Sequence, residues 1–265
     1  MKKALLIPSI FLFVVLVAGV LAPIIAPYSF EDQNIEARLE KPSGAHIMGT
    51  DSLGRDLYSR VLYGARASMA VGIVTALVSV IIGTLFGALA GFFGGWVDIV
   101  IMRVVDIFYI LPSLLLAILV MVVVGQGLFG ILISLGIVGW VNQARLVRAQ
   151  VMQVKEFLHV EAARAGGASD FRIITRHILP LIVGPVIVSL TFQIPTNIMS
   201  ESFLSFIGIG LQPPYSSWGT LAAEGFRGMR SYPHLIIYPG LVLFFTMLAF
   251  QFLGDALRDR LDPRE

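Results

Sequence analysis

The chain has 265 residues, a net charge of +2 and no cysteine. Only 14% of its residues are charged and 57% are hydrophobic, whereas soluble domains carry about 25% charged residues. The chain therefore lacks the charge to cover a water-facing surface, and we expect an integral membrane protein. The absence of cysteine excludes disulfides, thiol catalysis, cysteine metal ligands and a lipoprotein anchor, and the small net charge does not suggest a nucleic-acid partner.

Six apolar stretches are long enough to cross a bilayer, which takes about 20 apolar residues per helix. They predict an all-α, polytopic protein with six transmembrane helices near residues 4–26, 68–93, 99–124, 127–147, 180–206 and 235–256. The predicted organisation is a first transmembrane helix within 1–26, an extracytoplasmic segment 27–67, and a five-helix core 68–265 that contains a cytoplasmic loop 148–179.

The first stretch has two interpretations. Lys2 and Lys3 precede an apolar run, as in a signal peptide. The run is about 22 residues, long for a signal core, and Pro23 directly follows the plausible cleavage site Val20-x-Ala22. We therefore expect a retained membrane helix.

Glycines and prolines predict local features of two further stretches. Gly83, Gly87 and Gly91 lie on one face of the second stretch, and such a stripe lets two helix backbones approach closely in lipid. Glycine is also simply common in membrane helices. Pro185 and Pro195 interrupt the fifth stretch, which we expect to be kinked or locally unwound.

The distribution of basic residues predicts the orientation. Twelve lysines and arginines, counting Arg103 and Arg145 at membrane edges, lie on the side of the termini and the 148–179 loop, against seven on the other side. Cytoplasmic loops carry the excess of Lys and Arg, so both termini are predicted to be cytoplasmic.

The 148–179 loop is predicted to form two short helices. The alanines of Glu161-Ala162-Ala163 give a narrow helical surface, and Gly166-Gly167 permits a sharp turn. Ser169 or Asp170 is suited to cap the second helix.

That second helix is predicted to be amphipathic. Phe171, Ile174 and Ile178 would share one face, with Arg172 and Arg176 on another. Such a helix fits a groove on a partner protein, or lies on anionic lipid headgroups. The physical chemistry leaves these two alternatives equal.

The sequence Glu161-Ala162-Ala163, then Gly167, then Leu179-Pro180 resembles the "EAA" loop of ABC importer permeases, with His177 at a position that is commonly isoleucine. In that family the loop forms a coupling helix that docks onto the ATP-hydrolysing subunit. The resemblance assigns ATPase coupling to Glu161, Ala162, Ala163, Gly167, Asp170, Phe171, Arg172 and Ile174.

Three more segments narrow the resemblance to the dipeptide, oligopeptide and nickel importer branch. They are His46–Arg60, Leu204–Pro214 with the following Ser217-Trp218-Gly219, and Gly254–Pro263. The resemblance spans most of the chain and is closest to the second of the two permease subunits in such systems. It implies a type I importer permease fold and alternating access, in a complex with a homologous permease, two cytoplasmic ATPase subunits and an extracytoplasmic substrate-binding protein. Peptide is the first substrate expected, and nickel or a metal chelate the alternative.

The chain itself carries no recognisable site for catalysis or cofactors. None of its four lysines lies in a phosphate-binding glycine-rich loop, and its four histidines are widely spaced. We therefore expect no catalytic residue, metal site or cofactor here, with ATP and Mg²⁺ bound by the partner ATPase subunits. An ion-coupled secondary transporter is the rival from another class, and it leaves the EAA-like loop unexplained.

The outer segment is predicted to turn between Gly49 and Gly54, with Asp51 as a cap and Asp56 and Arg60 paired at i, i+4. Its next apolar residues are expected to lie along the membrane surface: Leu57, Val61 and Leu62. The segment either positions an outer gate or contacts a delivery protein, or it is a structural clamp over the helix ends.

Polar residues at membrane depth are costly to bury and are candidates for function. Gln193, Asn197 and Glu201 share one face of the fifth stretch. We predict that they line the translocation pathway, with hydrogen bonding between helices as the alternative.

Two other polar pairs lie at membrane depth. Arg103 and Asp106, three residues apart, are predicted to form a structural ion pair. Asn142 and Gln143 near the cytoplasmic end of the fourth stretch are left undecided between the two roles.

Overall fold

The computed structural model describes residues 2–261, with side chains from Leu5 onward, so that Arg264 and the end of the Gly254–Pro263 match lie outside the described residues. Its elements are helical throughout this range, apart from one isolated bridge between Thr50 and Asp56. The α-helices are α1 Lys2–Val20, α2 Ala22–Ile25, α3 Leu57–Phe93, α4 Gly95–Ile110, α5 Ser113–Val124, α6 Leu128–Val154, α7 Leu158–Ala165, α8 Asp170–Ile173, α9 Leu179–Phe206, α10 Trp218–Arg227 and α11 His234–Leu261. A short 3-10 helix spans Ile35–Ala37 and a π-helix spans Ile174–Ile178. The prediction of an all-α protein is confirmed.

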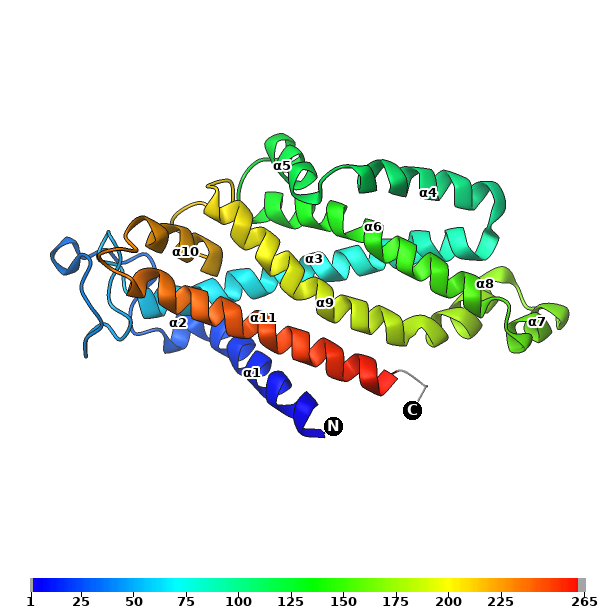
Figure 1. The fold of residues 1–265 in the computed structure, drawn as a ribbon, viewed down its shortest axis with the longest axis horizontal. Coiled ribbons are helices and arrows are strands. Elements are labelled where there is room, and N and C mark those ends of the chain that lie inside the picture. The colour runs from blue at the N-terminus through cyan, green and yellow to red at the C-terminus, as the bar shows by residue number, and fades with distance from the viewer. Residues whose placement is uncertain (1, 262–265) are drawn as a thin grey trace.

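The helices account for the six predicted apolar stretches. Four of them are long and apolar enough to cross a membrane: α3, α6, α11, and the continuous run Asp170–Phe206 that ends with α9. Helices α4 and α5 pass the same test only as a pair bent by 94°, and α1 contributes the shorter apolar helix Leu5–Val20. Figure 1 shows these segments running back and forth along the long axis of the molecule.

The third stretch is not the single helix predicted over 99–124. It breaks between Ile110 and Ser113, where Leu111 is extended, with ψ at 137°. The reason is Pro112, because proline disfavours helical geometry in the residue before it and has no N–H to donate.

The second stretch begins earlier than predicted. Helix α3 starts at Leu57, because the Asp56 side chain accepts the Ser59 N–H at 2.8 Å and caps the helix. The boundary that we placed at residue 67 therefore falls inside α3. Leu57 and Val61 are buried in the core and do not lie along the membrane surface, so that expectation was wrong.

The fifth stretch stays helical through both of its prolines. The α-helical conformation of α9 runs unbroken from Leu179 to Phe206 and includes Pro185 and Pro195. The local unwinding that we considered is therefore absent from this helix. The irregular turn lies before it, in the π-helix.

The glycine stripe packs α3 against α6, as predicted. A Cβ added at Gly83 would lie 2.7 Å from the Trp140 carbonyl oxygen, and one at Gly91 would lie 2.8 Å from that of Arg148. The absence of side chains lets the two helices approach each other along this line.

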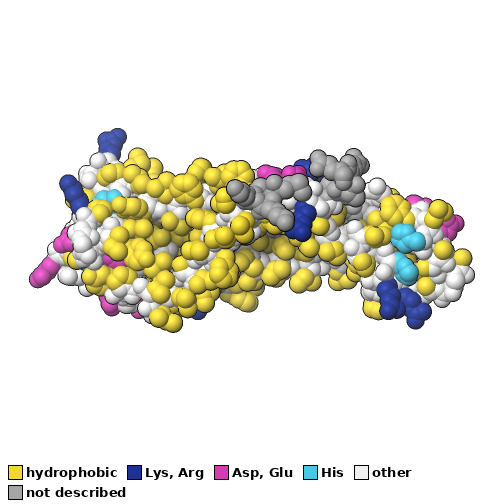
Figure 2. All heavy atoms as spheres, turned by 90° about the horizontal axis from the view of Figure 1, so that it is seen from below, with side chains coloured by type: hydrophobic (Ala, Val, Ile, Leu, Met, Phe, Trp, Pro, Cys, Tyr) yellow, Lys and Arg dark blue, Asp and Glu magenta, His cyan; other side chains and the backbone are white. Residues whose placement is uncertain are grey.

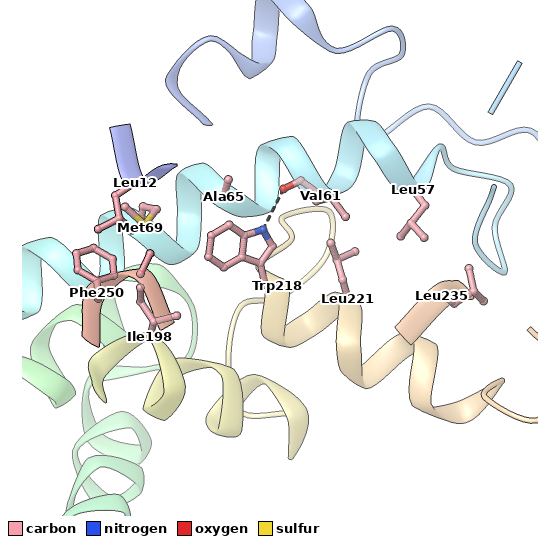
Figure 3. Packing of buried hydrophobic residues seen from close by; sticks show 11 residues of the cluster. Leu12, Leu57, Val61, Ala65, Met69, Ile198, Trp218, Leu221, Leu235 and Phe250 are labelled. Carbon is pink, nitrogen blue, oxygen red and sulfur yellow. Dashed lines mark hydrogen bonds between the residues drawn. The ribbon is translucent and has the colours of Figure 1, made fainter. Parts of the chain in front are cut away.

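A hydrophobic core at one end of the bundle joins α3 to α10 and α11. Figure 3 shows Trp218 of α10 pointing at α3, where its indole N–H donates to the Val61 carbonyl at 3.1 Å. Leu57, Leu221 and Leu235 complete this packing. The core fixes α10 and the start of α11 against the first turns of α3.

The two ends of the bundle carry different segments. In Figure 1 the 27–56 segment and α10 lie at one end, and α7 and α8 at the other. On the face seen in Figure 2, hydrophobic side chains cover most of the length and charged side chains gather mainly toward the ends. After the orientation predicted from the basic residues, we call the end with the 27–56 segment and α10 the outer end, and the end with α7 and α8 the inner end.

Candidate functional site

The inner end is built from two short helices joined by a glycine turn. Helix α7 ends at Ala165, and Gly167 has a φ of +79°, the left-handed conformation that glycine adopts freely. Helix α8 begins at Asp170 with Ser169 as its N-cap residue. The predicted helix–turn–helix shape of this loop is confirmed.

Phe171, Ile174 and Ile178, which were predicted to share one apolar face of the second helix, do not lie on one face. Phe171 is 77% exposed, whereas Ile178 is fully buried among side chains of the inner core and Ile174 packs against the edge of that core. The cause is the π-helix over 174–178, because its i→i+5 bonding shifts the side chains out of the 3.6-residue period. Ile173, which the sequence analysis did not select, is the buried residue of α8.

The remaining coupling-loop residues are mostly at the surface. Leu158, at the start of α7, is 83% exposed. The exposed residues of the predicted set are Glu161, Ala162, Gly167, Asp170, Phe171 and Arg172, and Ala163 and Ile174 are half-buried. The inner end thus presents exposed apolar side chains, namely Phe157, Leu158 and Phe171, beside the polar residues of the loop.

Two ion pairs join α4 to α6 near the inner end. Arg148 donates to both carboxylate oxygens of Asp98, at 2.5 and 2.6 Å. Arg145 donates to Asp106 at 2.5 Å and lies over the Tyr109 ring, 3.7 Å from its centre. These pairs fix the first half of the broken span against α6.

The predicted Arg103–Asp106 ion pair is wrong. The partner of Asp106 is Arg145, from a helix nearly forty positions later. Because Pro112 bends the span, α4 lies along α6, and Asp106 meets a cation there rather than one turn back on its own helix.

A cavity of about 350 Å³ lies between α5, α6 and α9. Its lining consists of Ser113, Leu114, Leu135, Val138, Gly139, Asn142, Gln143, Leu146, Ser189, Phe192, Gln193, Thr196, Asn197 and Ser200. Two of the three predicted pathway residues, Gln193 and Asn197, are among them. So are Asn142 and Gln143, whose role the sequence left open.

Hydrogen bonds hold the amide side chains around this cavity. Gln193 Nε2 donates to the Gly139 carbonyl at 3.1 Å, and Asn197 Nδ2 donates to Thr75 Oγ1 at 2.7 Å. Gln143 Oε1 accepts from the Ser189 hydroxyl. The polar stripe of α9 thus both faces the cavity and ties α9 to α3 and α6.

Glu201 lies outside this cavity. Its side chain is fully buried and accepts hydrogen bonds from Ser205 Oγ at 2.7 Å and from Ser68 Oγ of α3 at 3.4 Å. Ser68 Oγ also accepts the Trp218 N–H at 3.2 Å. The carboxylate therefore takes part in the hydrogen bonding that joins α9, α3 and α10.

The outer end is held by buried charges. Asp51 accepts from Arg55 Nε at 2.7 Å and from Arg60 Nη1 at 2.5 Å, and it caps the Gly49–Gly54 turn through the Leu53 N–H. Both glycines have positive φ, as the predicted turn requires.

Arg60 continues the network to α10. It donates to Glu224 at 2.6 and 3.1 Å, and its side chain is 1% exposed. The predicted Asp56–Arg60 pair is wrong, because Asp56 caps α3 and pairs with His46 at 2.9 Å. Sequence spacing alone gave no signal for Glu224, which lies far along the chain.

The family model described as "Binding-protein-dependent transport system inner membrane component" matches residues 83–265. The chain belongs to this family. It is therefore an inner membrane component of a binding-protein-dependent transport system, and the expected permease fold is confirmed.

Three curated relatives match nearly the whole of this permease. The dipeptide transport permease DppC of Bacillus subtilis is 42% identical over 96% of the chain and 79% of its own length. The oligopeptide transport permease OppC of the same species is 39% identical, over 99% and 86%. The glutathione transport permease GsiD of Pectobacterium atrosepticum is 41% identical, over 96% and 85%.

Solved structures of ABC transporters share the permease fold. A chain of the inward-facing MetNI methionine transporter matches with a TM-score of 0.60 and 20% identity, over 77% of this chain and 97% of that one. A chain of an amino acid ABC transporter matches with a TM-score of 0.59 and 15% identity, over 77% and 94%. At these identities the likeness shows the fold.

Proposed function

We propose that this permease forms half of a translocation pathway for dipeptides or oligopeptides and couples that pathway to a separate ATPase. The observation that carries the proposal is the identity of 39–42% to the B. subtilis dipeptide and oligopeptide permeases over 96% or more of the chain. The third relative is a permease of a glutathione transport system, and glutathione is a peptide-like cargo. Nickel or a metal chelate is the alternative cargo.

The complete importer contains, in this proposal, a homologous second permease, two cytoplasmic ATPase subunits and an extracytoplasmic substrate-binding protein. ATP and Mg²⁺ bind to the ATPase subunits, and this chain carries no nucleotide site of its own. Both termini and the 148–179 loop face the cytoplasm, and the 27–67 segment lies outside. The excess of Lys and Arg on the side of the termini and the 148–179 loop supports this orientation.

Coupling takes place through the loop that contains α7 and α8. Closure of the ATPase dimer on ATP moves this loop, and the helix bundle changes the side to which the pathway is open. The exposed side chains Phe171 and Leu158 support docking, because they offer apolar area for a partner protein to bury. The lipid-headgroup alternative would leave both in contact with membrane rather than protein.

Phe171→Asp tests the docking role. In the reconstituted importer, the variant should hydrolyse ATP without transporting substrate, because a charge would replace the apolar contact that transmits the movement. Phe171→Leu is the matched control and should transport at nearly the wild-type rate. Normal transport by Phe171→Asp would show that the docking assignment is wrong.

Uptake measurements test the cargo. Proteoliposomes loaded with ATP should accumulate labelled dipeptide in the presence of the binding protein, and accumulation of nickel instead would favour the alternative. Co-purification with a P-loop ATPase is also expected. Uptake driven by an ion gradient in the absence of such a partner would favour the secondary transporter.

A further inference from the structure

The cavity between α5, α6 and α9 has a lining that is polar but uncharged. It contains four amide side chains and four hydroxyls, and among the described residues that line it there is no Asp, Glu, Lys, Arg or His. The charged groups of α6, such as Arg145 and Arg148, pair with α4 instead. A substrate in this cavity would meet hydrogen-bond donors and acceptors and apolar carbon, and no fixed charge.

One buried amide in the lining has a nitrogen without a hydrogen-bond partner among the described residues. Gln143 is 3% exposed, and its Oε1 is bonded to Ser189. Within the described residues its Nε2 is a buried nitrogen without a hydrogen-bond partner. Turning the amide over would pair the nitrogen with Ser189 and leave the oxygen unpaired, so one polar atom lacks a partner in either orientation.

A buried polar atom without a partner is costly, and such an atom is commonly completed by a ligand or by water. The other two buried or half-buried amides of the cavity, Gln193 and Asn197, already donate to protein oxygens. Among these three amides, Gln143 is thus the one whose buried nitrogen would gain a partner from a ligand's carbonyl.

We propose that this cavity binds the main-chain amide of a peptide in transit, with Gln143 as the principal hydrogen-bond partner and without any contact to a charged side chain. The proposal rests on the peptide-transport function proposed above. A peptide bond offers one donor and one acceptor irrespective of sequence, and an amide side chain matches both.

Because the lining is uncharged, the cavity does not select peptides by the charge of their side chains. Two unit charges 4 Å apart interact by about 4 kcal/mol at an effective dielectric constant of 20, so a fixed charge would strongly favour one sign of side chain over the other. The uncharged lining applies no such selection. This half of the pathway therefore binds the backbone of the peptide and does not discriminate between side chains by their charge.

Transport by Gln143 variants of the complete importer tests the proposal with three labelled dipeptides: Ala-Ala, Ala-Lys and Ala-Glu. Gln143→Ala should lower the uptake of all three by a similar factor, about fivefold, as expected for loss of one hydrogen bond. Gln143→Glu should lower Ala-Glu uptake more than Ala-Lys uptake, since it places a negative charge in the cavity. Wild-type uptake of all three by Gln143→Ala, or a loss confined to one charge class, would overturn the proposal.

A second measurement locates the peptide directly and does not depend on turnover. The chain has no cysteine, so Asn142→Cys places a single thiol at an exposed position in the cavity lining. Millimolar Ala-Ala should slow maleimide labelling of this chain in the detergent-solubilised importer by several-fold. Ser231→Cys, exposed at the outer end, is the matched control and should label at the same rate with and without peptide.

The two proposals fail in different ways. If the wild-type importer takes up none of the three peptides, the proposed cargo is wrong. The proposed binding of a peptide amide at Gln143, which we call the amide site, is then wrong as well. If the wild type transports peptides but Asn142→Cys is not protected and Gln143→Ala transports normally, only the amide site is wrong.

Discussion

The outer and inner ends of this permease use the same kind of ion pair in different surroundings. At the outer end, the Arg60 and Asp51 side chains are 1% and 6% exposed and join the 27–56 segment to α3. At the inner end, the Arg148 and Asp98 side chains are 32% and 17% exposed. Charges buried in this way need their partners, whereas half-exposed charges are solvated in part by water.

The two ends differ in how the chain's own charges hold them, although both leave large apolar side chains exposed, among them Ile35 and Ile47 at the outer end. The outer segment is held by a connected network that reaches Glu224 of α10, and the indole of Trp218 is buried beneath it. The inner end leaves Phe171 and Leu158 at the surface. The buried network favours a structural clamp as the role of the outer segment, and the covering of the inner end by another subunit belongs to the proposed coupling function.

The largest loss of stability is expected on substitution of Arg60. Arg60→Met should lower the free energy of unfolding of the permease by about 3 kcal/mol, because it leaves a buried carboxylate with one cation fewer. Thermal unfolding in detergent measures the loss. Arg66→Ala, an exposed arginine further along α3, should change the stability by less than about 0.5 kcal/mol. Equal stability of the two variants would contradict the clamp.

The next largest loss of stability is expected in the α3–α6 seam, by which we mean the close packing of these two helices along Gly83, Gly87 and Gly91. A methyl group at Gly87 would lie 2.5 Å from the Ala144 carbonyl oxygen and 2.9 Å from Val147 Cβ. Gly87→Ala should therefore push α3 from α6 and cost about 1–3 kcal/mol. At Gly240, where a Cβ meets nothing within 4 Å, the same change should be neutral or stabilising. Thermal unfolding that ranks the two variants in the opposite order would exclude a close α3–α6 seam.

The sequence predicted the features that depend on local chemistry. Apolar length gave the membrane segments, the spacing of Gly83, Gly87 and Gly91 gave a helix-packing face, and the turn between Gly49 and Gly54 followed from glycine itself. Each of these is decided by residues close together in the chain.

What the sequence missed depends on contacts between distant residues. The Arg145–Asp106 and Arg60–Glu224 pairs join helices far apart in sequence, so the i, i+3 and i, i+4 rules selected the wrong partners. The break before Ser113 had a visible signal in Pro112, which lay inside a stretch that we treated as continuous. The unpaired amide of Gln143 has no signal in the sequence, because it depends on the packing of three helices.

A smaller loss of stability is expected when the Asp98–Arg148 ion pair at the inner end is broken. Asp98→Asn should cost about 1 kcal/mol, because the exposed part of Arg148 remains hydrated after its partner is removed. A double-mutant cycle with Arg148→Gln should give a coupling energy of similar size. A coupling as large as the loss at Arg60 would mean that the two ends are built alike and that the comparison does not hold.

The smallest change in stability is expected on substitution of Phe171. Substitution of Ile173, two residues away, should by contrast lower the stability strongly. In the permease pair without its ATPase, Phe171→Ser should leave the free energy of unfolding within about 0.5 kcal/mol, since the side chain is 77% exposed. Ile173→Ser should cost about 3 kcal/mol, because Ile173 is fully buried in the inner core.

Binding of the ATPase should reverse this order between the two positions. Truncation of a large apolar side chain in an interface costs about 1–3 kcal/mol, or about 10- to 100-fold in affinity, so Phe171→Ser should bind the ATPase much more weakly than the wild type does. A folded Ile173→Val permease, which keeps the exposed surface of α8 intact, should bind it nearly as tightly as the wild type. If Phe171→Ser bound the ATPase with unchanged affinity, the exposed face of α8 would not be the docking surface, and its apolar character would be explained by contact with lipid.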